Sequence, residues 1–321
     1  MSSKSSIKNL LHLSIPIFFA NLAIPLVAIV DTGLMGNLDD ASYLTATSIA
    51  SSLFSMIFWS FGFLRMGTVG MVAQAHGSNQ YNEIVDLVFR NITFVIVISL
   101  LLIFLQHFIF NLGLQIFDLS NDTEKYFKDY FYIRIYSSFG ELTIFVITGL
   151  FIGLQKTKIS SVVVGFFSVT NIIFSLFFVL YFKLNVTGVA LGTLVSSTLT
   201  SFIFLIYTFF ELKKLTNINF DIKKIFNVKK IQNIFNINFN IFVRSVLLTF
   251  SFLFFTYLGN TISEDVVAAN TILINLIFLS AFILDAYAFS TEGIVGYSIG
   301  SKNITLLRNV IKNSFMLSAS T

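Results

Sequence analysis

Long apolar segments recur along the chain, and short polar segments separate them. Most of the apolar segments reach the ~20 residues that a helix needs to cross a bilayer. We therefore predict helices at residues 10–35, 42–65, 84–117, 126–153, 158–182, 187–211, 237–258 and 266–297, with a further helix that starts at 304. This pattern indicates an all-α, polytopic membrane protein.

The composition supports this class and excludes others. Hydrophobic residues make up 55% of the 321 residues and charged residues 11%, against roughly 25% charged in soluble domains. The chain has no cysteine, which excludes disulfide and thiolate chemistry. Its three histidines, His12, His76 and His107, are too scattered to indicate a metal site. No nucleophile–base pair stands out either, so we expect neither an enzyme nor a bound cofactor or metal.

One sizeable polar segment, residues 212–236, divides the chain. It carries six lysines and one acid, Asp221. The positive-inside rule places such a segment in the cytoplasm, and counting six helices back also places the N-terminus there. We predict an N-terminal lobe at 1–211, a basic linker at 212–236 and a partial C-terminal lobe at 237–321. This charge bias explains the lysines more simply than nucleic-acid binding does, so no nucleic-acid partner is expected.

The sequence contains an internal repeat. The segment TVGMVAQAHGSNQ (68–80) aligns with TEGIVGYSIGSKN (291–303) at an offset of 223, and five of the thirteen positions are identical. The two copies start six helices apart, an even number, so they run in the same direction across the membrane. Such parallel repeats are typical of secondary transporters, which place a substrate path between two lobes.

The repeat also predicts a length for the second lobe. The first lobe ends near Lys213, so a complete second copy would end about 223 residues later, roughly 115 residues beyond Thr321. We therefore expect two six-helix lobes, of which the second is incomplete in this chain. Either the sequence is a fragment or the gene is truncated.

Asp31 is the first candidate for chemistry, because it lies in an otherwise apolar run from Leu10 to Met35. A charged side chain in a membrane interior costs at least ~2.5–3.5 kcal/mol, and a buried acid tends to bind a proton. The repeat places Phe254 at the equivalent position, so the acid is not duplicated. A carboxylate near the interface and hydrated is the structural alternative. We interpret Asp31 as an acid that can be reversibly protonated.

Other candidates are weaker when taken from the pattern alone. Pro16 and Pro25 are the only prolines and both lie in the first helix, where each removes a backbone donor and favours bending. Asn171 and Thr193 offer polar groups in two later helices, although hydrogen bonding between helices would explain them equally. Passive kinking is the alternative for the prolines.

The second lobe offers an acidic pair and a cation. Asp285 and Glu292 are seven residues apart and so share one helix face. Arg244 is the nearest cationic candidate in the preceding helix. We predict that these three side chains lie close enough to interact. A charge-paired structural cluster is as consistent with the pattern as a transport site.

Several longer motifs resemble a known family. They occur in the order VDTGLMGNL, FLRMGTVGMVAQAHGS, YFYIR, GLFIGLQ, NVTGVALGT, FVRSVLL and LDAYAFSTEGIVGYSIGS. They are similar to segments of the multidrug and toxic compound extrusion family, in its DNA-damage-inducible F branch. The resemblance covers essentially the whole chain. It implies twelve transmembrane helices in two lobes, and exchange of a proton or sodium ion for a drug-like, often cationic, small molecule.

The resemblance also implies roles for individual residues. Asp31 matches the protonation site of that branch, and Pro16, fifteen residues earlier, matches its bending proline. Asn171 and Thr193 match the polar residues of the fifth and sixth helices. Ser175 departs from the pattern, because the branch usually has an aspartate there. That departure puts a two-carboxylate site in doubt.

The resemblance implies an efflux antiporter of the cell (inner) membrane, with membrane lipid and a small-molecule substrate as partners and a monomeric state when full length. Two alternatives remain open. One is a flippase for lipid-linked oligosaccharides, which would more naturally have several cationic residues lining its cavity. The other is a truncated inactive product or a subunit that needs a second chain.

Overall fold

The structure, a computed structural model, describes residues 7–38, 40–117, 119–216, 227–262 and 264–320, and for some residues between 233 and 279 the backbone alone. The described part is all-α. Its helices are α1 (Ile7–Gly36), α2 (Ala41–Ser60), α3 (Phe63–Gly77), α4 (Tyr81–Phe104), α5 (Gln106–Ile116), α6 (Asn121–Arg134), η1 (Ile135–Ser137), α7 (Ser138–Gly153), α8 (Thr157–Leu176), η2 (Phe177–Tyr181), α9 (Asn185–Leu215), α11 (Val228–Ile262), α12 (Glu264–Gly300) and α13 (Ile304–Ser320).

The predicted helices are confirmed, with corrections to their ends and continuity. The segment predicted at 42–65 breaks at residues 61–62 and continues as α3 to Gly77. The glycines Gly67 and Gly77 of this extension are buried packing residues of the helix. The segments predicted at 84–117 and 158–182 each contain a junction between two helical pieces, and the segment predicted at 126–153 contains three pieces, α6, η1 and α7. The predicted linker is helical at both ends, to Leu215 and from Val228, and residues 217–226 lie outside the described part.

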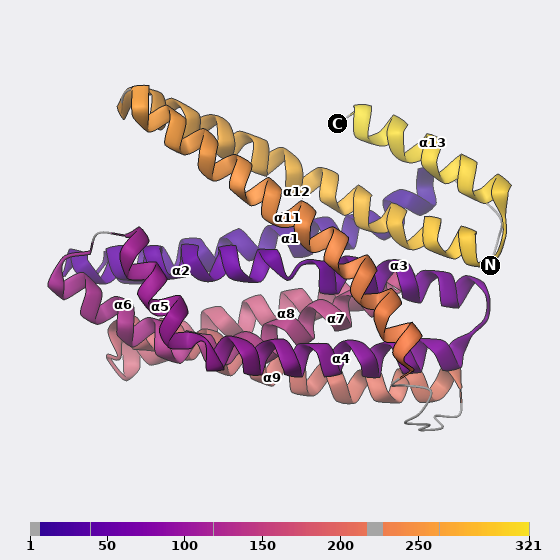
Figure 1. The fold of residues 1–321 in the computed structure, drawn as a ribbon, viewed down its shortest axis with the longest axis horizontal. Coiled ribbons are helices and arrows are strands. Elements are labelled where there is room, and N and C mark those ends of the chain that lie inside the picture. The colour runs from indigo at the N-terminus through magenta and orange to yellow at the C-terminus, as the bar shows by residue number, and fades with distance from the viewer. Residues whose placement is uncertain (1–6, 39, 118, 217–226, 263, 321) are drawn as a thin grey trace.

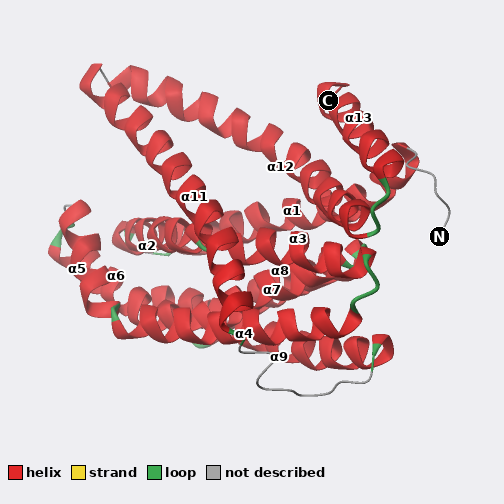
Figure 2. Cartoon of the chain, turned by 45° about the vertical axis from the view of Figure 1, so that its right-hand side comes forward, coloured by secondary structure: helices red, strands yellow, loops and turns green. Residues whose placement is uncertain are grey.

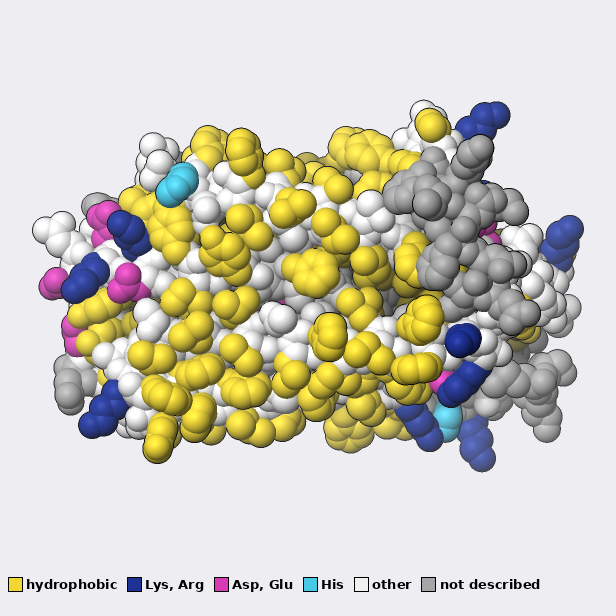
Figure 3. Space-filling model, turned by 90° about the horizontal axis from the view of Figure 1, so that it is seen from below, with side chains coloured by type: hydrophobic (Ala, Val, Ile, Leu, Met, Phe, Trp, Pro, Cys, Tyr) yellow, Lys and Arg dark blue, Asp and Glu magenta, His cyan; other side chains and the backbone are white. Residues whose placement is uncertain are grey.

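Seven helical segments of the described part are long and apolar enough to cross a membrane. They correspond to the first seven predicted helices. The eighth predicted helix, 266–297, is present as α12, which includes side chains outside the described part. Figure 3 shows hydrophobic side chains over the middle of one face, with charged side chains gathered at its two ends. This distribution is that of a protein whose middle lies in lipid.

The helices form two groups that meet along α3 and α12. Helices α1 to α9 form the first group, and α11 to α13 follow it (Figure 1). Helix α1 packs against α8 of its own group and against α12 of the other group. Helices α11 and α12 diverge from α2 and α6 toward the end of the molecule away from the N-terminus (Figures 1 and 2). The first helix is therefore a direct link between the two groups.

The internal repeat is visible in backbone detail. The turn that follows α3 and the turn that follows α12 have the same hydrogen bonds, Gln80 N to Ala75 O at 2.8 Å and Asn303 N to Ser298 O at 2.9 Å. Each turn contains one residue with positive φ, Asn79 at 58° and Lys302 at 56°. All three pairs of positions are related by the offset of 223. In Figure 1, α1 and α11 also run in the same direction. The two copies are thus parallel, as predicted.

The two copies pack against each other through glycines. A Cβ atom on Gly77 would collide with the main chain of Tyr297 and Ser301, and one on Gly300 would collide with the main chain of Gln74. Gln74 and Tyr297 are equivalent positions of the repeat, so these contacts are reciprocal. Between them Gly296 faces its own equivalent, Ala73. An approximate twofold axis therefore passes between Ala73 and Gly296, and we call this contact of α3 with α12 the glycine seam.

Enlarging a glycine of the seam should destabilise the protein. Gly300→Ala places a methyl group against the backbone of Gln74, and overpacking of this kind costs about 1–3 kcal/mol. Gly165→Ala in α8 is the matched control, because a Cβ there meets nothing within 4 Å and alanine is the better helix former by less than ~1 kcal/mol. Thermal unfolding in detergent measures both. Equal unfolding temperatures for the two variants would contradict close packing at the seam.

Candidate functional site

Asp31 lies in α1 where this helix packs against α8. Its side chain is half-buried, and its Oδ1 atom is buried with no hydrogen-bond partner in the described part of the chain. The Ser175 hydroxyl of α8 and, through longer-range attraction, the Arg134 guanidinium of α6 interact with the carboxyl group. A buried acceptor without a donor is costly. Asp31 therefore has a free position for a proton or a ligand.

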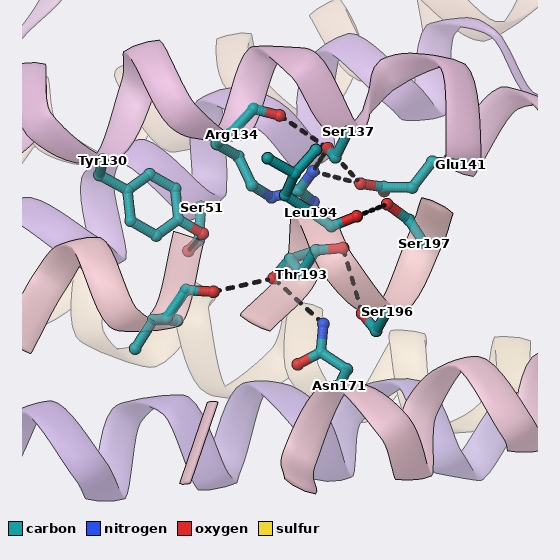
Figure 4. A network of polar contacts seen from close by, with 11 residues as sticks. Ser51, Tyr130, Arg134, Ser137, Glu141, Asn171, Thr193, Leu194, Ser196 and Ser197 are labelled. Atoms are coloured by element: carbon teal, nitrogen blue, oxygen red, sulfur yellow. Dashed lines mark hydrogen bonds and ion pairs between the residues drawn. The ribbon is translucent and has the colours of Figure 1, made fainter. Parts of the chain in front are cut away.

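The structure brings Ser175, Asn171 and Thr193 together beside Asp31. Ser175 Oγ donates to Asn171 Oδ1 at 3.3 Å, and Asn171 Nδ2 donates to Thr193 Oγ1 at 3.1 Å. Thr193 Oγ1 donates in turn to the carbonyl of Val189 at 3.2 Å. Figure 4 shows Asn171 and Thr193 pointing toward one another from two helices. The four polar residues predicted from the sequence thus form one continuous chain of contacts, which we call the polar chain.

The polar chain depends on the close approach of α8 and α9. Asn171 and Ser175 are four residues apart and so lie on one face of α8. Gly192 of α9 lies against the main chain of Ser175, and Gly188 against that of Phe178. Asn171, Ser175 and Thr193 are all buried. Because glycine has no side chain, α9 comes near enough for Thr193 to reach Asn171.

A second polar group lies next to the polar chain. Arg134 of α6 forms an ion pair with Glu141 of α7 and donates to Ser137 between them. Its guanidinium also lies over the rings of Phe54 and Phe58, 5.2 Å from each centroid. Figure 4 shows this group above Thr193. The spacing of seven residues between Arg134 and Glu141 was the available signal, although it did not indicate which side faces the site.

Both prolines lie within α1, which continues through them. Pro25 has no N–H, so the carbonyl of Asn21 lacks its usual helical donor. Asn21 is buried, and its Nδ2 donates to the carbonyl of Phe282 in α12 at 3.4 Å. Pro16 lines a groove of about 380 Å³ between α1 and α8. The segment between the prolines therefore contacts both lobes.

The structure only partly matches the predicted interaction of Arg244 with Asp285 and Glu292, the residues that we call the second-lobe cluster. Glu292 is half-buried and Asp285 is exposed. The cation that interacts with both acids is Arg65 of α3, and Arg244 of α11 acts on Glu292 alone. Arg244 is exposed and its Nη2 donates to Met66 Sδ at 3.3 Å. With Arg65, the cluster therefore spans the two lobes. Within the described residues no group of three His, Asp or Glu side chains could hold a metal ion.

Comparisons with known proteins bear on the family and the fold of the chain. The model of the MatE family matches residues 16–177. The chain is 28% identical over 306 residues to the DNA damage-inducible protein F of Escherichia coli (strain K12), covering 95% of this chain and 66% of that protein. It is 23% identical over 247 residues to the multidrug export protein MepA of Staphylococcus saprophyticus, covering 76% of this chain and 54% of that protein. The chain thus spans between half and two thirds of the length of these curated relatives.

Solved structures share the fold. One is a multidrug resistance MATE family transporter of the MOP superfamily in an outward-facing conformation, with a TM-score of 0.87 at 17% identity over 97% of this chain and 69% of that chain. Another is a MOP superfamily transporter from Pyrococcus furiosus, with a TM-score of 0.87 at 16% identity and the same coverage. The resemblance inferred from the motifs and the predicted fold class are therefore confirmed. The roles of the individual site residues stay predictions.

The ion pair beside the site offers a test of its energetics. Glu141→Leu leaves the Arg134 charge without its partner, so we expect it to destabilise the protein by about 3–5 kcal/mol. The double variant Arg134→Met/Glu141→Leu removes both charges and should recover most of that loss. Unfolding in detergent measures all four combinations. A double variant as unstable as Glu141→Leu would contradict the pairing.

Proposed function

The chain belongs to the MatE family, and from that premise we propose that it takes part in the export of drug-like organic cations in exchange for protons. The proposal rests above all on Asp31, a half-buried carboxyl group with an oxygen that lacks a hydrogen-bond donor in the described part. The printed names of two similar proteins, a multidrug export protein and a multidrug resistance transporter, support the substrate class. Sodium is the alternative coupling ion.

The hydrogen bonds of the polar chain depend on whether Asp31 is protonated. The Ser175 hydroxyl has one proton, and in this structure it donates that proton to Asn171. While it donates to Asn171, the Ser175 hydroxyl can only accept a hydrogen bond from Asp31. Only a protonated carboxyl group can donate one. A carboxylate would instead accept the Ser175 proton, and Asn171 would lose its donor. We propose that loss of the Asp31 proton rearranges the polar chain and changes the packing of α1 on α8.

Exchange follows if proton and substrate compete. Protonated Asp31 is neutral and attracts no cation, whereas the carboxylate does. A ligand shifts a conformational equilibrium only through its different affinity for the two states. Helix α1 contacts both α8 and α12, and its two prolines make bending less costly. We propose that the two forms of Asp31 favour different shapes of α1 and so different arrangements of the lobes.

The charge distribution favours this function over an oligosaccharide flippase. Each of Arg65, Arg90 and Arg134 in the described interior has an acidic neighbour. The interior therefore has no excess of positive charge at these positions to attract a diphosphate group. We further propose that the N-terminus is cytoplasmic and that the protein resides in the cell (inner) membrane, on the basis of the lysines near residues 213–230.

Asp31→Asn tests the proposed function. The amide keeps the shape of the acid but cannot release a proton, so dye efflux from everted vesicles under an imposed pH gradient should fall to background. Asn171→Ala and Thr193→Ala should each reduce efflux by about fivefold, because each loses a neutral hydrogen bond of ~1 kcal/mol.

Asp122→Asn is the matched control, because it makes the same change at an exposed position in the first turn of α6. It should leave efflux unchanged. The unfolding temperature should not fall in Asp31→Asn, because a neutral amide costs less to bury than a carboxylate. If Asp31→Asn exchanges protons for dye at the wild-type rate, Asp31 is not the coupling site.

A further inference from the structure

Three residues of α12 form one chemically distinctive face. Asp285, Phe289 and Glu292 are spaced by four and three residues, so they lie on the same side of the helix, about 6 Å and 4.5 Å apart along its axis. The guanidinium of Arg65 lies over the Phe289 ring, with its central carbon 3.9 Å from the ring centroid. Arg65 belongs to α3 of the other lobe. A cation from one lobe thus sits on an aromatic ring between two acids of the other lobe.

Arg65 is held differently from the structural arginines of this protein. Arg90 is fully buried and forms ion pairs with Glu83 at 2.8 Å and Asp86 at 3.4 Å, and Arg134 is paired with Glu141. By contrast, Nε of Arg65 is buried with no hydrogen-bond partner among the described residues. Asp285 and Glu292 attract Arg65 without forming a close ion pair with it. The guanidinium is therefore held by the Phe289 ring and by electrostatic attraction to the two acids. A competing cation could replace it.

The surroundings of Arg65 are those that recognise an organic cation. An aromatic face attracts a cation that lies over it. Phe289 supplies the ring, and Asp285 and Glu292 supply negative charge. Asp285 is exposed, and Gly70 of α3 lies next to the Oε1 atom of Glu292, which a Cβ at position 70 would approach to 3.8 Å. Phe289 itself is 3% exposed and lies under Arg65, so a ligand would reach the ring only when Arg65 moves away from it.

We propose that Asp285, Phe289 and Glu292 form a binding site for an organic cation with a flat, delocalised charge, and that Arg65 occupies this site in the present structure as a tethered competitor. The inference rests on the proposed function for its substrate class, but the binding can be measured without transport. A cation that displaces Arg65 removes a contact between α3 and α12 beside the glycine seam. Binding would then weaken the contact between the lobes, which is a direct link between substrate and conformation.

The test is ethidium binding to the purified protein in detergent at one fixed pH, followed by fluorescence anisotropy. Asp285→Asn, Glu292→Gln and Phe289→Leu should each weaken binding by about three- to tenfold, because each removes a charge or the ring. Arg65→Gln should strengthen binding by a similar factor, because it removes the competitor. A purely structural Arg65 would give the opposite sign or no effect.

Matched controls make the same chemical changes elsewhere. Arg308→Gln on the exposed side of α13 and Asp122→Asn on α6 should each leave ethidium affinity within about twofold of wild type. If Arg65→Gln does not yield folded protein, Arg65→Lys replaces it, because lysine lacks the flat group and should compete less well. The proposal is overturned if neither acid variant changes the affinity beyond the controls, or if a folded Arg65 variant binds no more tightly than wild type.

Asp31→Asn separates this inference from the proposed function. It should lose proton-driven efflux, and the ethidium binding that remains in it should still weaken on Asp285→Asn, Phe289→Leu or Glu292→Gln. Efflux that survives Asp31→Asn would count against the proposed function and leave the ethidium result unaffected. Ethidium binding that ignores Asp285, Phe289 and Glu292 would count against this inference alone.

Discussion

The glycine seam between α3 and α12 is the contact on which the arrangement of the two lobes depends. Its glycines let two helix backbones touch, and the reciprocal contacts of Gly77 with Tyr297 and of Gly300 with Gln74 fix the relative rotation of the helices. In a membrane there is little hydrophobic force between helices, so close packing through small residues is the main source of such specificity. The seam lies at the end that contains the N-terminus, and α11 and α12 diverge from the first lobe toward the other end (Figure 2).

Helix α1 is the second link between the lobes and the one that carries a titratable group. It packs on α8 through the region of Asp31 and on α12 through the region of Asn21. The two prolines and Asn21 lie on the side of Asp31 toward the N-terminus, so a bend among them would move Asp31 relative to the seam. The proposed exchange depends on this combination of a close contact at one end and a proline-containing helix beside it.

Much of this structure could be predicted from the sequence, for reasons that can be named. The lengths of the apolar segments predicted the membrane-spanning helices. The parallel repeat could be detected at an offset of 223 because the glycines that pack the two copies together occur in both. Asp31 stood out because a carboxyl group is rare in an apolar run, and the resemblance added Asn171, Thr193 and Ser175. The predicted helix ended at residue 65, whereas α3 extends to Gly77, because its last turns are less apolar than the segment before them. Arg65 was not assigned because its partners are more than two hundred residues away, and only the seam brings α3 beside α12.

The proposed exchange requires that the protonation state of Asp31 sets the shape of α1, and the absence of native cysteines allows a direct measurement of that shape. Spin labels on cysteines placed at Asn37, beyond the end of α1, and at Lys128 of α6 occupy exposed positions. Their separation, measured by pulsed electron paramagnetic resonance, should change between acid and alkaline pH when Asp31 is present. In Asp31→Asn it should remain at the acid value throughout. A pH-dependent change of the same size in Asp31→Asn would contradict the account.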